Sequence, residues 1–258
     1  MQTEDEIWRS DRQPDCGASS LGGGADSSNR PWETDSLRTG AGDPPLTLGL
    51  LAICAAAVLS LADMALAYAP EGGYGFGLYQ PFEALPQWRL MLGHCTGMLL
   101  LPAYIPGYWQ VCRNLREAGA WLSRAVFVIG SLTAVIAATC HGGVALRALM
   151  VQTGFGGPAS ERVLGLARGI SDPLSGWINI PFALASFGFT LAVLSGRTRF
   201  PRWLAYANPM VVGLVFVAPS LAAPTFLPAL LAAPASFNLA HLVFFCLVTA
   251  SLRQDRPD

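Results

Sequence analysis

The chain has 258 residues, of which 52% are hydrophobic and only 13% are charged. A soluble domain carries about a quarter charged residues, so this composition and a mean hydropathy of +0.42 exclude that class and indicate an integral membrane protein. The net charge of −1 also excludes a basic nucleic-acid-binding surface, so nucleic acid is not an expected partner.

The N-terminal segment, residues 1–44, differs in composition from the rest of the chain. It holds nine of the 17 acidic residues and four of the 16 basic ones. Its stretch 16–30 is rich in glycine, serine and alanine, and has too little apolar surface to offset the entropy of ordering. We expect a disordered cytoplasmic tail over 1–44, a transmembrane helical domain over 45–252, and a short cytoplasmic C-terminal tail over 253–258.

Six apolar stretches are long enough to be membrane-spanning helices. A span needs about 20 mostly apolar residues, because about 30 Å of hydrocarbon is crossed at about 1.5 Å per residue. The predicted spans lie near 45–69, 87–110, 120–149, 172–195, 203–222 and 236–252. The sequence therefore predicts an all-α fold, an integral membrane bundle of about six helices without internal repeats.

The segment between the last two spans contains three prolines, Pro224, Pro228 and Pro234. Proline disfavours one continuous helix, so this segment is either a loop or a short re-entrant piece. Both interpretations keep the number of spans at six.

The positions of the arginines predict the orientation, because connections that face the cytoplasm retain positive charge. Arginines gather after the second, fourth and sixth spans: Arg113, Arg116, Arg124, Arg197, Arg199, Arg202, Arg253 and Arg256. On the other side, only Arg162 and Arg168 lie between spans three and four, with Arg89 at the start of span two. We expect both termini in the cytoplasm and a multi-pass protein of the cell membrane, the inner membrane in a bacterium.

Four ionisable side chains inside these spans are the candidate catalytic residues: Asp63, His94, His141 and His241. Placing a charged side chain of this kind in the membrane costs about 2.5 to 3.5 kcal/mol on insertion scales, so its presence indicates a structural or functional role. Counted along the helices from the predicted outer ends, all four lie roughly 7 to 12 Å deep. We expect them to converge on one pocket in the outer half of the bundle.

Four further residues near the same level are candidate substrate-binding residues: Asp172, Trp177, Asn179 and Asn238. Asn179 follows Asp172 by two helical turns and so lies below it on the same face. In the inner half, the main polar residue is Asn208, and Asn-Pro at a helix start is more typical of a turn or an N-cap than of a ligand.

Each candidate also has a structural interpretation. An intramembrane histidine can hydrogen-bond a carbonyl or a neighbouring helix. Asp172 precedes Pro173 and fits an N-cap followed by proline at the first helical position. Asp63, inside LADMALAY, must be paired or protonated, and a histidine of a neighbouring helix is the expected partner.

Several spaced motifs resemble a known family: LAD in the first span, WRLMLGH and IPGYWQV in the second, SGRTRFPRW followed by NPM, and FNLAHLVFF in the last. Together they are similar to a largely bacterial family of polytopic membrane proteins classed as a domain of unknown function. The resemblance covers about residues 45–252. It implies a membrane fold and assigns no catalytic residue.

Three functions fit these polar residues at a similar predicted depth. The first is a membrane-embedded enzyme that isomerises or cyclises an isoprenoid-like lipid, because histidine and carboxylate are suited to proton transfer and aromatic faces stabilise a cation. The second is a protein that binds haem through two histidines, or a metal through three histidines and Asp63. The third is a small-molecule transporter or sensor. The expected partner is a membrane lipid or lipophilic small molecule, while the cofactor, the reaction and the oligomeric state stay unassigned.

The orientation gives a first testable prediction. A reporter that is active only outside the cytoplasm, fused after Asp258, should be silent, because the arginines place the C-terminus inside. The same reporter in the connection after Gln152 should be active. A strong signal from the C-terminal fusion would overturn the six-span orientation.

Overall fold

The computed structural model describes residues 46–67, 85–154, 157–222 and 234–254. The predictions for the tail 1–44, for the segment 223–233 and for 255–258 lie outside the described residues. The described part is helical throughout, apart from its short connections, which confirms the all-α fold class. Its helices are α2 (Leu46–Ala67), α3 (Gln87–Leu100), α4 (Tyr104–Leu115), α5 (Ala120–Gln152), α6 (Pro158–Trp177), α7 (Asn179–Leu194), α8 (Pro209–Ala222) and α10 (Ser236–Gln254).

Short 3-10 turns join some of these helices into longer rods. One, Leu101–Ala103, links α3 to α4, and another, Arg116–Ala118, ends α4. Ile178, between α6 and α7, keeps helical dihedral angles. As a result, residues 87–118 and 158–194 each form an almost uninterrupted helical segment.

Four helical segments are long and apolar enough to cross a membrane: Leu46–Leu66, Gln87–Ala118, Ala120–Gln152 and Pro158–Leu194. Two shorter apolar helices, Pro209–Pro219 and Ser236–Leu252, occupy the last two predicted spans. In length and composition, the chain is thus a membrane-embedded helical bundle with four full spans and two shorter apolar helices in its described part.

The bounds of two predicted spans were wrong. The fourth helical segment begins at Pro158 rather than near 172, and Pro173 lies inside α6. Its first turns carry charge that suggested a loop, but a helix that extends past the hydrocarbon places those charges in water. The fifth helix begins at Pro209 rather than near 203, because residues Arg202–Ala207 form a 3-10 helix.

Asn208 caps the start of α8. Its side-chain Oδ1 accepts a hydrogen bond from the backbone N–H of Val211 at 3.1 Å, and Pro209 takes the first helical position. This geometry is that of an N-cap with proline at N1. The structural interpretation of Asn208 is therefore confirmed.

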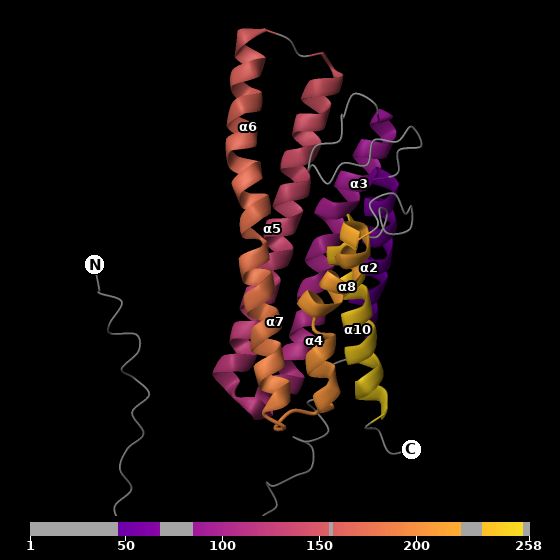
Figure 1. Cartoon of the computed structure of the whole chain (residues 1–258), viewed down its shortest axis with the longest axis vertical. Coiled ribbons are helices and arrows are strands. Elements are labelled where there is room, and N and C mark those ends of the chain that lie inside the picture. The colour runs from indigo at the N-terminus through magenta and orange to yellow at the C-terminus, as the bar shows by residue number, and fades with distance from the viewer. Residues whose placement is uncertain (1–45, 68–84, 155–156, 223–233, 255–258) are drawn as a thin grey trace, which may run out of the picture. The chain divides into compact units, whose positions relative to one another are not determined.

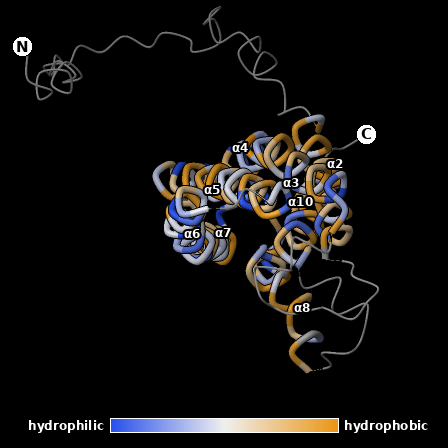
Figure 2. The backbone as a smooth tube through the Cα atoms, turned by 90° about the horizontal axis from the view of Figure 1, so that it is seen from above, coloured by the Kyte–Doolittle hydropathy of each residue, from blue (hydrophilic) through white to orange (hydrophobic). Residues whose placement is uncertain are grey.

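The helices pack in two neighbouring groups. α5 contacts α3, α4, α6 and α7, while α2 contacts α3, α4 and α10, and α10 also contacts α8. Figure 1 shows α5 and α6 as a long hairpin that rises beyond the other helices. Seen from above, in Figure 2, α5, α6 and α7 lie on one side and α2, α3 and α10 on the other.

The arginine-bearing connections lie together at one end, the lower end in Figure 1. Arg199, after α7, lies 3.7 Å from Glu117, after α4. The end of α10 and the start of α2 lie toward this end too, because Gly49 on α2 packs against both Thr249 on α10 and Gln110 in the second half of α4. We call it the arginine end. This clustering is what the predicted orientation requires, while the side of the membrane stays a prediction.

Small residues let α2, α4 and α10 approach closely. A Cβ added to Gly107 on α4 would stand 2.7 Å from Ala52 on α2 and 2.7 Å from the ring of Phe245 on α10. Ala52 and Phe245 are themselves buried. Close approach of this kind is how helices gain van der Waals contact in a lipid environment.

We expect Gly107→Ala to lower the free energy of unfolding by about 1 to 3 kcal/mol, because the added methyl group overpacks this contact. Thermal unfolding in detergent, followed by circular dichroism, measures the change. Gly165→Ala on α6 is the matched control, because a Cβ there has nothing within 4 Å and alanine favours a helix. Equal melting temperatures for the two variants would refute the close packing at Gly107.

Candidate functional site

Asp63 near the end of α2 is bound by a side chain of α10, which is bound in turn by α4. Its Oδ2 accepts a hydrogen bond of 2.6 Å from the Asn238 amide on α10. The Tyr104 hydroxyl on α4 donates to Asn238 Oδ1 at 2.7 Å. Because a carboxylate can only accept, Asn238 turns its NH₂ toward Asp63, and its oxygen is left to accept from the Tyr104 hydroxyl.

The expected partner of Asp63 was a histidine, and this prediction was wrong. His241 lies three residues after Asn238 on α10 and binds Tyr108 instead. His241 lies on the same face of α10 as Asn238 but about one turn further along, so it meets Tyr108, one turn beyond Tyr104 on α4, rather than Asp63. Asn238, predicted to bind substrate, is the residue that holds Asp63.

His241 is fully buried, and both of its ring nitrogens are occupied. Nδ1 lies 2.8 Å from the Phe237 carbonyl oxygen, which can only accept, so Nδ1 carries the proton. Nε2 then accepts from the Tyr108 hydroxyl at 2.9 Å. The Tyr104 ring stacks on the imidazole with centroids 4.6 Å apart, which joins His241 to the Asp63 group.

These contacts define one polar network on three helices, which we call the Asp63 network: Asp63 on α2, Tyr104 and Tyr108 on α4, and Asn238 and His241 on α10. Four of its members are buried, whereas Asp63 is only partly buried. Asp63 is therefore the least enclosed residue of the network.

His94 and His141 form a separate pair between α3 and α5. Their Nδ1 atoms lie 3.4 Å apart, with the rings inclined at 59°. A Cβ on Gly97, one turn after His94, would collide with the His141 ring, so the glycine makes room for it. Among the described residues, no hydrogen bond joins this pair to the Asp63 network.

Asp63 and His94 lie at similar levels, because Leu66 on α2, three residues after Asp63, meets Gly93 on α3, next to His94. His241 lies deeper, since it bonds Tyr108 on α4. Tyr108 follows His94 by fourteen residues of the rod formed by α3 and α4, which is about 21 Å along the axis. The structure therefore places His241 away from the level of Asp63 and the other two histidines.

Arg147, which the sequence interpretation missed, is buried in α5 and forms an ion pair with Asp172. Its Nη1 lies 2.6 Å from Asp172 Oδ1, and the aspartate side chain is 41% exposed. Asp172 is therefore not an N-cap as one interpretation held, since it lies inside α6. Arg147 could have been found from the sequence, because it falls inside the predicted span 120–149.

Trp177 and Asn179 lie away from both groups. Trp177 is 67% exposed at the end of α6, and exposed Asn179 donates to the Gly176 carbonyl at 3.2 Å. With Asp172 paired to Arg147, the three residues of this segment lie near α5, α6 and α7. The structure does not bring them together with Asp63 or His241.

The half of the bundle near the arginine end is more polar than expected. Gln110 and Asn114 on α4 and Thr249 on α10 are buried. Asn114 donates to the Gln110 carbonyl at 2.8 Å, whereas Gln110 Nε2 and Thr249 Oγ1 have no hydrogen-bond partner among the described residues. The expectation that Asn208 is the main polar residue there was wrong.

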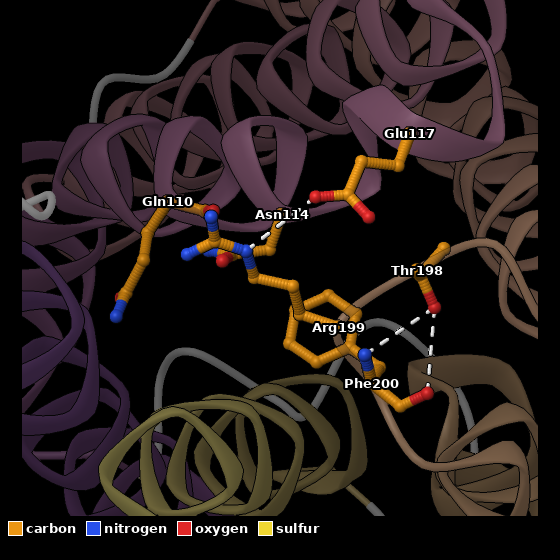
Figure 3. Close-up of polar contacts among 6 residues, drawn as sticks. All are labelled: Gln110, Asn114, Glu117, Thr198, Arg199 and Phe200. Carbon is orange, nitrogen blue, oxygen red and sulfur yellow. Dashed lines mark hydrogen bonds and ion pairs between the residues drawn. The ribbon is translucent and has the colours of Figure 1, made fainter. Parts of the chain in front are cut away.

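Figure 3 shows the side chains of Gln110 and Asn114 projecting from α4 on the same side as Arg199, next to the Arg199–Glu117 ion pair. In the connection that follows α7, the Thr198 hydroxyl accepts a hydrogen bond from the Phe200 N–H at 3.3 Å. This turn holds the chain between α7 and the 3-10 helix Arg202–Ala207 against α4.

The predicted metal site with three histidines does not assemble in the described part of the chain. No group of three or more histidine, cysteine, aspartate or glutamate side chains is arranged there to hold a metal ion. The two nitrogens of His241 are engaged, and its partner histidines lie at another level. A metal or a haem held by Nε2 of His241 would have to replace its hydrogen bond with Tyr108, while Nδ1 could keep its bond to Phe237.

The fold and the site define an all-α membrane protein built around a buried hydrogen-bonded network with one carboxyl group. Residues 46–255 match the family of unknown function DUF6796. The match covers most of the chain, including every helix described above, so the chain belongs to this family. No curated protein and no solved structure gives a significant match.

The Arg147–Asp172 pair gives a prediction for stability. Asp172→Asn should cost about 1.5 to 3 kcal/mol, because the buried guanidinium loses a charged hydrogen-bond acceptor. Thermal unfolding measures the effect, with Asn179→Ala on the same helical segment as the control. Replacing both partners, Arg147→Met with Asp172→Leu, should restore part of the loss. Equal stability of Asp172→Asn and the control would contradict a structural role of the pair.

Proposed function

We propose that the protein is a membrane-embedded enzyme that performs acid–base chemistry on a lipophilic substrate, with Asp63 as the residue that exchanges a proton with it. The observation that carries the proposal is the chain of hydrogen bonds from Tyr104 through Asn238 to Asp63. General acid–base catalysis needs a proton-transferring group held in a fixed orientation. Here one carboxylate oxygen is held by Asn238 on α10, which Tyr104 on α4 holds in turn.

Accessibility supports the same assignment. Asn238 is 2% exposed and Tyr104 fully buried, whereas Asp63 is only partly buried. Asn238 and Tyr104 use their polar groups to hold Asp63 and each other, which leaves the other oxygen of Asp63 for proton exchange. We therefore assign Asn238 and Tyr104 as positioning residues and Asp63 as the catalytic one.

The surroundings of the network favour a substrate that passes through a carbocation. Around His241 lie the rings of Tyr104, Phe182, Phe237 and Phe245, with centroids 4.4 to 5.7 Å from the imidazole. Aromatic faces stabilise a cation in a desolvated site. Isomerisation or cyclisation of an isoprenoid-like lipid would use both the acid–base group and these rings.

His94, His141 and the residues of α6 stay outside this site, whereas α7 contributes Phe182. We place the arginine end in the cytoplasm, as the positive charges favour. Asp63, near the end of α2, then lies toward the outer side of the bundle, and His241 lies deeper.

A transporter is the second candidate, and one observation favours it. Polar side chains occur in both halves of the bundle formed by α2, α4 and α10, since Gln110 and Thr249 follow the Asp63 network toward the arginine end. Between the two groups, however, lies an apolar layer of Ala52, Gly107 and Phe245. This layer interrupts a polar path, so the enzyme is the better supported function.

Deuterium exchange tests the enzyme proposal on a mixture of candidate lipids, so that no single substrate has to be chosen. The purified protein is placed in bilayers that contain isoprenoid quinones and polyprenyl lipids and is incubated in D₂O. Removing and returning a carbon-bound proton introduces deuterium, which mass spectrometry of the extracted lipids detects. We expect the wild type to label one isoprenoid species and Asp63→Asn to label it about 100-fold more slowly, the scale of a lost general acid–base group.

The controls separate catalysis from folding. Glu117→Gln, an exposed change at the arginine end, should keep full labelling, and Asn238→Ala should give a rate between the wild type and Asp63→Asn. All variants are checked for a monodisperse peak on size exclusion. Equal labelling by the wild type and Asp63→Asn would refute the proposal, as would the absence of labelling by the folded wild type.

A further inference from the structure

The pair of histidines between α3 and α5 is not used by the proposed site. His94 Nδ1 and His141 Nδ1 face each other at 3.4 Å, and His94 is 7% exposed while His141 is partly buried. We propose that His94 and His141 bind a transition-metal ion through these two nitrogens, at the end of the bundle away from the arginine end.

The distance between the nitrogens favours an ion over a direct hydrogen bond. Hydrogen bonds from N–H groups have donor–acceptor distances of about 2.7 to 3.2 Å, shorter than the 3.4 Å seen here. Two imidazole nitrogens about 2.0 to 2.1 Å from a tetrahedral ion lie about 3.3 to 3.4 Å apart. The observed separation is that of two ligands around one ion.

The rings are held in place by the backbone around them. His141 packs over Gly97, where any side chain would collide with its ring, and the histidines belong to two long, regular helices, α3 and α5. A site built on rigid helices keeps its ligands at a fixed separation. The arrangement therefore need not form anew when an ion binds.

The charge around the pair tolerates a cation. Arg147 lies six residues after His141 on α5, and its charge is offset by Asp172 at 2.6 Å. Within the described residues, no third histidine, cysteine or carboxylate completes a set of ligands. The remaining positions would hold water or a bound molecule, as in open metal sites. Imidazole ligands select Cu²⁺, Ni²⁺, Co²⁺ or Zn²⁺ over Mg²⁺ and Ca²⁺.

Metal titration of the intact protein tests this proposal. The protein is purified without a polyhistidine tag, reconstituted into nanodiscs and titrated with Cu²⁺, Ni²⁺, Co²⁺ and Mg²⁺ by calorimetry. We expect one ion per chain, with Cu²⁺ bound more tightly than Ni²⁺ and Ni²⁺ more tightly than Co²⁺, and no binding of Mg²⁺. The chain has three histidines, and the third is fully engaged, so background binding is small.

Two single variants identify the ligands. His94→Gln and His141→Gln should each weaken Cu²⁺ binding at least about ten-fold. Thr139→Ala, at an exposed position two residues before His141 on α5, is the control and should leave Cu²⁺ binding unchanged. Electron paramagnetic resonance of the bound Cu²⁺ should show coupling to two imidazole nitrogens in the wild type. This spectrum keeps the test decisive if a glutamine variant fails to fold.

The outcomes separate this site from the proposed enzyme. Asp63→Asn should keep the Cu²⁺ affinity of the wild type even where it stops deuterium exchange. Failure of the folded wild type to bind Cu²⁺ at about 100 μM, far above the concentrations at which imidazole pairs bind it, would overturn the metal site. So would unchanged affinity in both glutamine variants, or a copper spectrum without two nitrogens.

Discussion

The amide of Asn238 is the contact on which the arrangement of α2, α4 and α10 depends. It accepts from Tyr104 and donates to Asp63, so that one side chain joins three helices. In a bilayer, lipid tails are as apolar as the helix surfaces, and helices associate through packing and hydrogen bonds rather than through the hydrophobic effect. The close contact at Gly107 brings the backbones near enough for these short polar side chains to meet.

The length of the helices decides where the other polar residues lie. α5 has 33 residues and the segment from α6 to α7 has 37, about 50 Å or more each and well beyond a hydrocarbon core of about 30 Å. Charged residues such as Arg147 and Asp172 can therefore belong to an unbroken helix without lying in the middle of the membrane. The histidine pair lies near the level of Asp63, because Gly93, next to His94, meets Leu66 on α2. It is separate from the Asp63 network because its two rings meet between α3 and α5.

The sequence predicted the helices better than the contacts between them. Apolar length identified the all-α membrane fold, and the intramembrane position of Asp63 identified it as a residue that needs a partner. Depth along a helix does not predict the direction in which a side chain points around it. For this reason, the prediction paired Asp63 with a histidine instead of Asn238. Tyr104 and Tyr108, one turn apart on α4, were missed because tyrosine is common in membrane helices and carries no charge. Pro173 was misinterpreted as a helix start, although α6 continues through it.

A neutral amide has an advantage over a charged partner beside a catalytic carboxyl group. Asn238 donates to an oxygen of Asp63, and a carboxyl group offers an acceptor oxygen in both its ionised and its protonated form. A histidinium or arginine in the same place would favour the ionised form alone. With an amide, Asp63 can take up and release a proton without breaking the hydrogen bonds that hold α2, α4 and α10 together. The contact that stabilises the bundle thus also leaves the carboxyl group able to change its protonation state during a reaction.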